Sequence, residues 1–263
     1  MKVKIMRLEK EEAKISYQEA GGIVIITIRR PQRRNALSQE MWQELKLLAE
    51  KSLLNKKNRV VILRGSGKEF TSGSDIKEFH EMSLEEAENA FVTMENTISF
   101  IENLPLPTIG VINGPAMGAG LELALACDLR IGSEHAKMGI PVGNLGITLN
   151  NKFTHRLVTL LGPSVTKELV YTGKIFAAEE AFEKGLLNLL VSSEKLNREA
   201  IELAKIISQQ SPASLRAIKK SVAESINSVP ELWKYSSTFV DPIDFPEGVA
   251  AFVEKRKPNF KNR

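Results

Sequence analysis

The chain alternates short β-branched runs with amphipathic helical patterns, and a glycine-rich or polar loop follows each run. Residues 21–30, 59–65 and 108–113 are predicted strands, because Val and Ile are frequent in them and turn residues bound them. Helical spacing of apolar residues returns behind Ser38, a suitable N-cap, and again over residues 83–102. This order predicts an α/β fold in which the loops at the strand ends build the functional site.

The end of the chain changes character, because its helical patterns follow one another with no strand between them. Such helices must cover their apolar faces against the core of the chain or against a neighbouring subunit. The sequence has no low-complexity segment, no repeat of fixed period and no linker rich in Gly or Ser. We therefore predict a core over residues 1–195 that carries the site, and a helical C-terminal region over residues 196–263.

Charge and cysteine content restrict the possible partners. Lys and Arg total 36 against 32 Asp and Glu, an excess that suits a polyanionic small molecule but is too small to indicate nucleic acid. Cys127 is the single cysteine, which excludes a disulfide framework and favours a reducing, intracellular location. No apolar stretch approaches ~18 residues. We expect a cytoplasmic protein without a signal peptide or membrane span, and no metal site, since the three histidines lack ligand spacing.

One polar residue interrupts an apolar segment. Glu122 lies in the run LELALAC, where every other side chain is apolar. On a helix its face is shared by Gly118, Leu125 and Ala126, so no Lys or Arg within one turn neutralises it. Burial there should raise the pKa of the carboxyl group by disfavouring its charged form, which suits a general acid or base near neutral pH. The alternative is a glutamate that reaches solvent or bonds to the backbone.

Three loops are candidates for the site, namely FTSGSD at 70–75, GPAMGAG at 114–120 and GIPVGNLGITLN at 139–150. A Gly-Ser-Asp turn can leave the backbone N–H of Ser74 unpaired and directed into a cleft. Glycines that open a helix leave N–H groups without intrahelical acceptors, where the positive end of the helix dipole favours an anion. Two such donors would hold an oxyanion.

Four motifs, RPQRRNALS, FTSGSDIKEF, INGPAMGAGLELALACD and YTGKIFAAEEAFEKGL, resemble in order and spacing those of the enoyl-CoA hydratase/isomerase (crotonase) superfamily. The resemblance covers nearly the whole chain, including the closing AFVEKRKPNF. It implies acyl-CoA thioester substrates, a crotonase-like spiral of repeated ββα units, and a helical C-terminal region for trimerisation or capping. It also implies a homotrimer or a dimer of trimers, with coenzyme A present only as part of the substrate and no separate cofactor.

The resemblance also assigns site residues. The oxyanion hole falls on the backbone N–H groups of Ser74 and Ala119, and Glu122 matches the first of two glutamates that the family's hydratases use as general acid and base. A CoA-binding loop is implied over residues 29–37, although its arginines also fit a solvated basic turn. The residues expected around substrate and CoA are Arg29, Arg30, Arg33, Asn35, Ala36, Leu37, Ser72, Gly73, Asp75, Ile76, Met117, Gly118, Val142, Asn144 and Asn150.

The second glutamate of the family's hydratases is absent, because Val142 occupies its position after Gly-Ile-Pro. Valine can neither accept nor donate a proton, so hydration by two carboxylates cannot operate in its usual form. The chain in this respect resembles the methylmalonyl-CoA decarboxylase branch, which keeps the first glutamate and reads Pro-Val-Asn-Leu-Gly in this region. The tyrosine that this branch carries downstream is Leu149 here.

Several functions therefore remain open. A hydratase with Glu122 as its single carboxylate could hold water with Asn144 or Asn150, and a decarboxylase could act on a malonyl-type thioester. A non-catalytic acyl-CoA-binding protein is another possibility, against which the cost of placing Glu122 in an apolar segment argues. RNA binding through the basic segment KSLLNKKNR at 51–59 is the last, although these residues also fit a solvated helix end.

Overall fold

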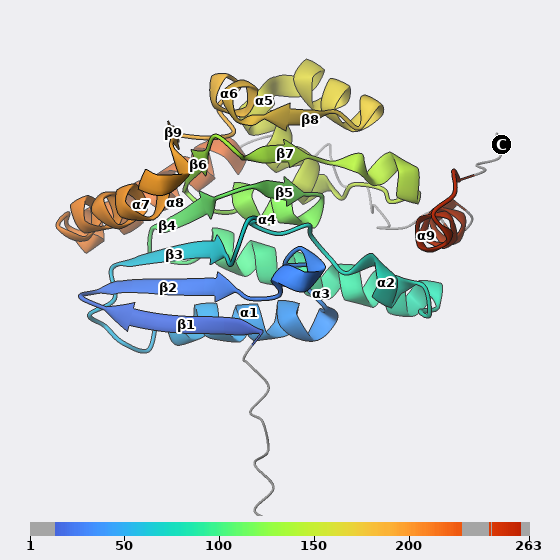
Figure 1. Cartoon of the computed structure of the whole chain (residues 1–263). Coiled ribbons are helices and arrows are strands. Elements are labelled where there is room, and N and C mark those ends of the chain that lie inside the picture. The colour runs from blue at the N-terminus through green and yellow to red at the C-terminus, as the bar shows by residue number, and fades with distance from the viewer. Residues whose placement is uncertain (1–13, 228–241, 243, 259–263) are drawn as a thin grey trace, which may run out of the picture.

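The computed structural model describes residues 14–227, 242 and 244–258. Its centre is a six-stranded sheet in the order β1-β2-β3-β4-β6-β9, in which only the pairing of β1 with β2 is antiparallel (Figure 1). A second sheet has three short strands in the order β5-β7-β8. The strands are β1 (Ile15–Ala20), β2 (Ile23–Ile28), β3 (Val60–Gly65), β4 (Thr108–Ile112), β5 (Pro115–Met117), β6 (Leu129–Ser133), β7 (Lys137–Gly139), β8 (Ile175–Ala177) and β9 (Leu189–Val191).

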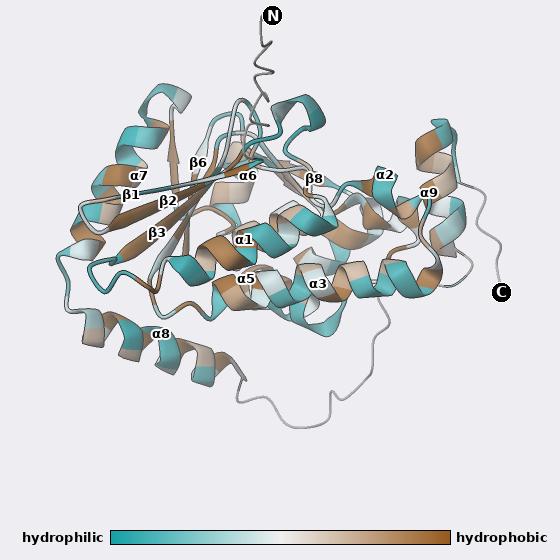
Figure 2. Cartoon of the chain, turned by 90° about the horizontal axis from the view of Figure 1, so that it is seen from below, coloured by the Kyte–Doolittle hydropathy of each residue, from teal (hydrophilic) through white to brown (hydrophobic). Residues whose placement is uncertain are grey.

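Helices lie between most of these strands and cover both faces of the large sheet (Figure 2). The α-helices are α1 (Gln39–Lys51), α2 (Ile76–Phe79), α3 (Leu84–Glu102), α4 (Ala119–Leu125), α5 (Asn151–Thr172), α6 (Ala178–Glu183), α7 (Ser193–Ser208), α8 (Pro212–Asn227) and α9 (Asp244–Glu254), with 3-10 helices η1 (Pro31–Arg33) and η2 (Pro141–Leu145). Figure 2 shows α1 and α3 beneath the sheet and α7 on its other side. None of the helices in the described ranges is long and apolar enough to cross a membrane.

The chain winds as a spiral of repeated ββα units, as the resemblance implies. Each unit places one strand in the large sheet, then a short extended segment in or beside the small sheet, and then a helix. The unit β4-β5-α4 follows this order fully. Isolated bridges between Leu37 and Ser74 and between Thr71 and Ala116 give the two preceding units their short extended segments. The predicted α/β class is therefore confirmed.

Local signals explain the helix starts. The side chain of Ser38 accepts a hydrogen bond from the backbone N–H of Met41, as an N-cap does. Ser83 and Glu86 form a reciprocal capping box at the start of α3. Helix α5 breaks at Gly162, which has φ 71° and ψ 166°, and a second helical segment resumes at Pro163.

The C-terminal region contributes to the core as well as covering it. The predicted boundary at residue 195 falls inside α7, whose Leu196, Ala200 and Ala204 are buried against strand residues of the large sheet. Helix α9 lies at the other end of the molecule, where Gly248 approaches the backbone of Leu145 so closely that a Cβ atom would lie 2.4 Å from its carbonyl carbon. This contact places α9 directly against η2.

Candidate active site

The candidate site lies at the carboxyl ends of the parallel strands, where the loops that follow β2, β3 and β4 meet. Loop 29–37 bonds to loop 66–75 through the N–H of Leu37, which donates to the carbonyl of Gly73 at 2.9 Å. Loop 66–75 bonds in turn to β5, since the N–H of Met117 donates to the carbonyl of Thr71 at 3.1 Å. Parallel strands bring their carboxyl ends to one edge, so three distant segments of sequence form one surface.

The two predicted oxyanion donors lie on adjoining loops. Gly73 has φ +91°, and a Cβ atom at this position would lie 3.1 Å from the backbone nitrogen of Ala119 and 2.8 Å from the carbonyl oxygen of Met117. Only glycine satisfies both the conformation and the space. Among the residues that the structure describes, no group accepts a hydrogen bond from the N–H of Ser74 or of Ala119. Both donors are therefore available to a ligand.

Side chains fix the Ser74 turn from behind. The indole Nε1 of Trp42 donates to Ser74 Oγ at 3.1 Å, and the Ser74 hydroxyl donates to the sulfur of Met94 at 3.5 Å. Gly73 is held as well, because its N–H donates to Thr71 Oγ1 at 3.1 Å. These contacts leave the backbone N–H of Ser74 as the part of this residue that is free to bind.

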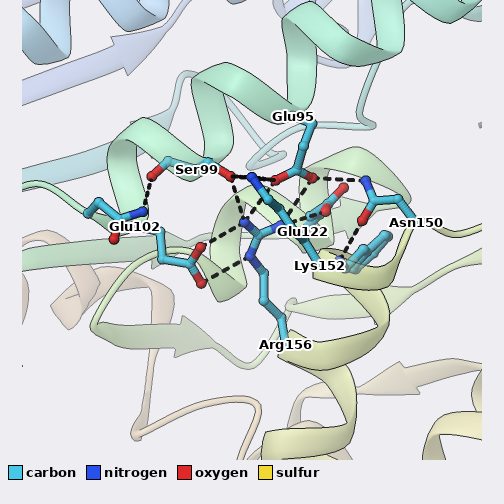
Figure 3. Close-up of polar contacts among 9 residues, drawn as sticks. Glu95, Ser99, Glu102, Glu122, Asn150, Lys152 and Arg156 are labelled. Atoms are coloured by element: carbon cyan, nitrogen blue, oxygen red, sulfur yellow. Dashed lines mark hydrogen bonds and ion pairs between the residues drawn. The ribbon is translucent and has the colours of Figure 1, made fainter. Parts of the chain in front are cut away.

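Glu122 is buried in the first turn of α4, with 1% of the residue exposed. Its partner comes from a different helix. Arg156, on α5, donates from Nη1 to Glu122 Oε1 at 2.7 Å, and its own side chain is also buried (Figure 3). The absence of a cation on the same helical turn was therefore predicted correctly, but a cation 34 positions later in the sequence supplies the pairing.

Arg156 also binds two glutamates of α3. Its Nη2 lies 3.0 Å from Glu95 Oε1 and 2.7 Å from Glu102 Oε2, and its Nη1 lies 3.2 Å from Glu95 Oε2. Glu95 receives further hydrogen bonds from Asn150 Nδ2 at 2.9 Å and from Ser99 Oγ at 2.6 Å. Figure 3 shows these side chains converging from α3, α4 and the start of α5.

The two buried carboxyl groups titrate in opposite directions. Burial, followed by repulsion from Glu95, raises the pKa of Glu122 well above its usual value, and the charge of Arg156 opposes this only in part. Burial also acts to raise the pKa of Glu95, but its hydrogen bonds and ion pair with Arg156 and its bond with Ser99 outweigh that effect and lower it to about 2. The predicted rise for Glu122 is confirmed in direction, and of the two buried carboxyl groups Glu95 is the one that ionises more readily.

The arginines of loop 29–37 differ in their availability. Arg30 Nη1 lies 2.7 Å from Asp75 Oδ2 and also donates to the carbonyl of Ala36. Arg30 and Asp75 were both expected around substrate and CoA, and in the structure they bind each other and hold the loop to the start of α2. Arg29 and Arg33 are exposed and have no side-chain partner among the described residues. They are the arginines of this loop that could bind phosphate.

The side chain of Asn35 has a structural role. Its Nδ2 donates to the carbonyls of Ser66 and Glu69 at 2.8 Å each, and its Oδ1 accepts from the N–H of Arg30 at 2.9 Å. The side chain is fully buried, and φ is +54°. The amide therefore fixes the shape of the loop and has no donor left for a CoA group.

The remaining predicted residues also differ in whether they are exposed or are held by contacts within the fold. Val142 is buried on η2 and Asn144 is exposed there. Asn150 was one of two residues proposed to hold water in a hydratase. In the structure its Oδ1 accepts from the N–H of Phe153, which caps α5, and its Nδ2 donates to Glu95. The other members of the predicted set line the junction of the loops in buried or half-buried positions, namely Ala36, Leu37, Ser72, Ile76, Met117 and Gly118.

Sequence reasoning missed Glu95 and Arg156, although a signal was present. Glu95 interrupts the apolar face of residues 84–102, four positions after Phe91 and three before Ile98. Arg156 sits between Phe153 and Leu157, which are both buried. A charged residue on an apolar helical face is the criterion that singled out Glu122, and it identifies all three members of the cluster.

A model of the family described as enoyl-CoA hydratase/isomerase matches residues 18–263. The chain belongs to this family. The enoyl-CoA hydratase/isomerase resemblance in the motifs is thereby confirmed, and the chain is an enzyme of a family that acts on acyl-CoA. Within the described residues, no group of His, Cys, Asp and Glu side chains is arranged to hold a metal ion.

Known members of the enoyl-CoA hydratase/isomerase family align over most of their length. A probable mitochondrial enoyl-CoA hydratase 2 of Arabidopsis thaliana is 38% identical over 246 residues, which are 90% of this chain and 81% of that protein. The crystal structure of an enoyl-CoA hydratase from Bacillus anthracis has a TM-score of 0.79 at 34% identity and covers 95% of this chain and 100% of that one. A methylmalonyl-CoA decarboxylase in complex with 2-nitronate-propionyl-CoA has a TM-score of 0.85 at 25% identity, with 95% and 99% covered.

Proposed function

We propose that this family member stabilises a thioester enolate with the backbone N–H groups of Ser74 and Ala119, and that Glu122 is the single carboxyl group that moves protons. The main support for this proposal is the close approach of Gly73 to Ala119. It brings two free N–H donors together at the start of the helix that bears Glu122. Preorganised donors stabilise the charge that develops on a thioester oxygen, and removing one such donor typically costs on the order of 100- to 1000-fold in rate.

The first candidate reaction is hydration of an enoyl-CoA. Water adds to the β-carbon, the electron pair of the double bond moves onto the thioester oxygen, and the α-carbon then takes a proton. With Val142 at the second position, Glu122 must first accept the proton of water and then return it to the α-carbon. Water and the enoyl thioester are consumed, a 3-hydroxyacyl thioester forms, and the enzyme ends in its starting protonation state.

The second candidate is decarboxylation of a malonyl-type thioester, such as methylmalonyl-CoA. The bond to the carboxylate breaks, its electron pair forms the enolate, CO2 leaves, and Glu122 donates one proton to the α-carbon. Two observations favour this reaction. Val142 is buried and cannot titrate, and the structure closely resembles that of a methylmalonyl-CoA decarboxylase.

Substrate binding is proposed for the loop junction. Arg29 and Arg33, which are exposed and have no side-chain partner among the described residues, would face the phosphates of coenzyme A. We also propose a homotrimer or a dimer of trimers in the cytoplasm. Support for assembly comes from α8, whose Ile218 and Val222 are exposed. Analytical ultracentrifugation of the full chain tests the assembly, and a monomer would refute it.

The decisive experiment compares turnover of crotonyl-CoA and methylmalonyl-CoA by the unchanged protein, by Glu122→Gln and by Glu183→Gln. Glu183 is an exposed glutamate on α6 that serves as the matched control. Hydration or CO2 release that Glu122→Gln loses and Glu183→Gln keeps supports the proposal and identifies the reaction. Full activity of Glu122→Gln on either substrate would refute it.

A further inference from the structure

The cluster around Arg156 contains more carboxylate than cation. Glu95, Glu102 and Glu122 all bond to its single guanidinium group. The nearest additional cation is Lys152, whose Nζ lies 3.9 Å from Glu95 Oε1 and whose side chain is 61% exposed, so water screens it. The buried part of the cluster can therefore hold fewer ionised carboxylates than it contains.

The three carboxyl groups are not equivalent. Glu102 has 40% of its side chain exposed and stays hydrated. Glu95 is buried, yet Arg156, Asn150 and Ser99 all donate to it. Glu122 is buried, its one cationic donor among the described residues is Nη1 of Arg156, which it shares with Glu95, and its carboxyl group also hydrogen-bonds with that of Glu95.

Among the described residues, the elements packed most closely on Glu122 bring no charged group to it other than members of the cluster. Helix α4 itself carries no second ionisable residue, and β5 reads Pro-Ala-Met. Of the charged side chains of the cluster on α3 and α5, Arg156 and Glu95 interact with Glu122 directly, whereas Glu102 binds Arg156 and Lys152 lies against Glu95. The balance between Glu95 and Arg156 therefore decides the state of Glu122.

We propose that Glu95 is a positioning residue for Glu122. Because the positive charge of Arg156 pairs mainly with Glu95, the Glu122 carboxyl group keeps its proton and a fixed orientation. The inference rests on the proposed function, in which Glu122 is the group that moves protons. Glu95 stands on α3 and is held by hydrogen bonds from Arg156, Asn150 and Ser99, so it acts through Arg156 and through its own negative charge rather than on the substrate. The raised pKa of Glu122 and the lowered pKa of Glu95 agree with this division.

The proton on Glu122 decides which class of reaction this residue can begin. A carboxyl group that carries a proton in the resting enzyme begins the reaction as a donor, whereas water activation needs a carboxylate. Decarboxylation consumes one proton at the α-carbon and needs only a donor. The structure therefore favours a thioester with a second carboxylate on the α-carbon as substrate, and Glu122 must regain a proton from solvent after each turnover.

The test measures the protonation of Glu122 directly and through catalysis. Infrared difference spectra of the full chain against Glu122→Gln isolate the stretch of the protonated Glu122 carboxyl group as pH rises. In parallel, the pH dependence of kcat/KM is measured with methylmalonyl-CoA. Both are repeated in Glu95→Gln and in the matched control Glu102→Gln, which removes a carboxylate from the same guanidinium but one that is partly hydrated and does not face Glu122.

We expect the protonated band in the unchanged protein at pH 7 and a fall in kcat/KM as pH rises through the pKa of Glu122. In Glu95→Gln both transitions should move to lower pH by about 1 unit or more, because a neighbouring negative charge is lost and Arg156 turns to Glu122. Glu102→Gln should move them by less. Glu95→Asp keeps the negative charge but moves it farther from Glu122, so its transitions should lie at an intermediate pH. This variant takes the place of Glu95→Gln in the test if Glu95→Gln unfolds.

Two results would overturn the inference. One is a Glu122 band absent at pH 7 in the unchanged protein, and the other is a band whose titration is the same in Glu95→Gln as in Glu102→Gln. Spectra that behave as expected while neither methylmalonyl-CoA nor crotonyl-CoA is turned over would uphold the role of Glu95 and refute the proposed function instead.

Discussion

Nη1 of Arg156 lies 2.7 Å from Glu122 Oε1 and 3.2 Å from Glu95 Oε2, so one nitrogen serves two carboxyl groups on different helices. Although burial opposes its charge, hydrogen bonds to Glu102 and Glu95 raise the pKa of Arg156, which stays protonated throughout the accessible range. The cluster joins α3, α4 and α5 around the candidate catalytic group. Its stability and its chemistry therefore depend on the same contacts.

Replacing Arg156 with Met should destabilise the fold strongly. The change leaves Glu95 buried without its main counter-ion, and removing one partner of a buried pair costs about 3–5 kcal/mol. Urea unfolding followed by circular dichroism measures the change. Glu95→Gln in the Arg156→Met background should recover part of the loss, and Arg198→Met, from an exposed pair with Glu199, should change the free energy of unfolding by about 1 kcal/mol or less. An Arg156→Met protein as stable as the Arg198→Met protein would contradict this expectation.

Gly73→Ala should abolish most activity while the fold remains. Its Cβ would enter the space next to the nitrogen of Ala119 and the carbonyl of Met117, at a φ of +91° that alanine rarely adopts. Displacement of either oxyanion donor should lower kcat on the order of 100-fold or more. Gly143→Ala is the matched control, because a Cβ there meets nothing within 4 Å. Equal kcat values for the two variants would show that the Gly73 contact does not shape the site.

Acid stability should depend on Glu95. Its pKa in the folded chain is lowered from 4.5 to about 2, so ionised Glu95 stabilises the fold above its unfolded pKa. This contribution is lost as pH falls from about 4.5 towards 2. Denaturant midpoints measured across this range should fall less steeply in Glu95→Gln than in the unchanged protein. Identical slopes in the two proteins would contradict the assignment.

Glu122 should have the opposite effect on stability. Its folded pKa is raised, so its contribution is fully present below the unfolded pKa and is lost as pH rises towards the folded value. Glu122→Gln, which cannot ionise, should therefore resist unfolding better than the unchanged protein at alkaline pH and equally well near pH 4. The same denaturant series, extended upwards, measures this, and a Glu122→Gln protein that weakens in parallel would be evidence against it.

Val142→Glu should raise hydration of crotonyl-CoA. The position follows Gly-Ile-Pro, where hydratases of this family carry their second glutamate, and a second carboxylate would let water activation and α-carbon protonation use separate groups. The expected gain in kcat/KM is on the order of 10-fold or more. Val142→Gln has a similar size without the ionisable group and should show no gain. A hydration rate unchanged in both variants would indicate that the absent glutamate is not what limits this reaction.

Much of the fold could be predicted, because local patterns carry the information. The runs of Val and Ile at 59–65 and 108–113, the N-cap at Ser38 and the helical spacing over residues 83–102 all correspond to elements of the structure. The strands of the small sheet were not predicted. Strands β5, β7 and β8 have three residues each, too few for a periodic pattern, and pairing between distant segments defines them.

Local sequence patterns specify the alternating α/β order, the two loops that bear Ser74 and Ala119, and the isolation of Glu122 within its own helix. These follow from short-range periodicity and from the conformational freedom of glycine. Packing in three dimensions brings Arg156 against Glu122, places Glu95 where it shares the same guanidinium group, and gives Asn35 and Asn150 their hydrogen bonds within the fold. The physical reason is that a buried charge is stabilised by whichever partner lies near in space, and sequence spacing along one helix does not reveal a partner on another.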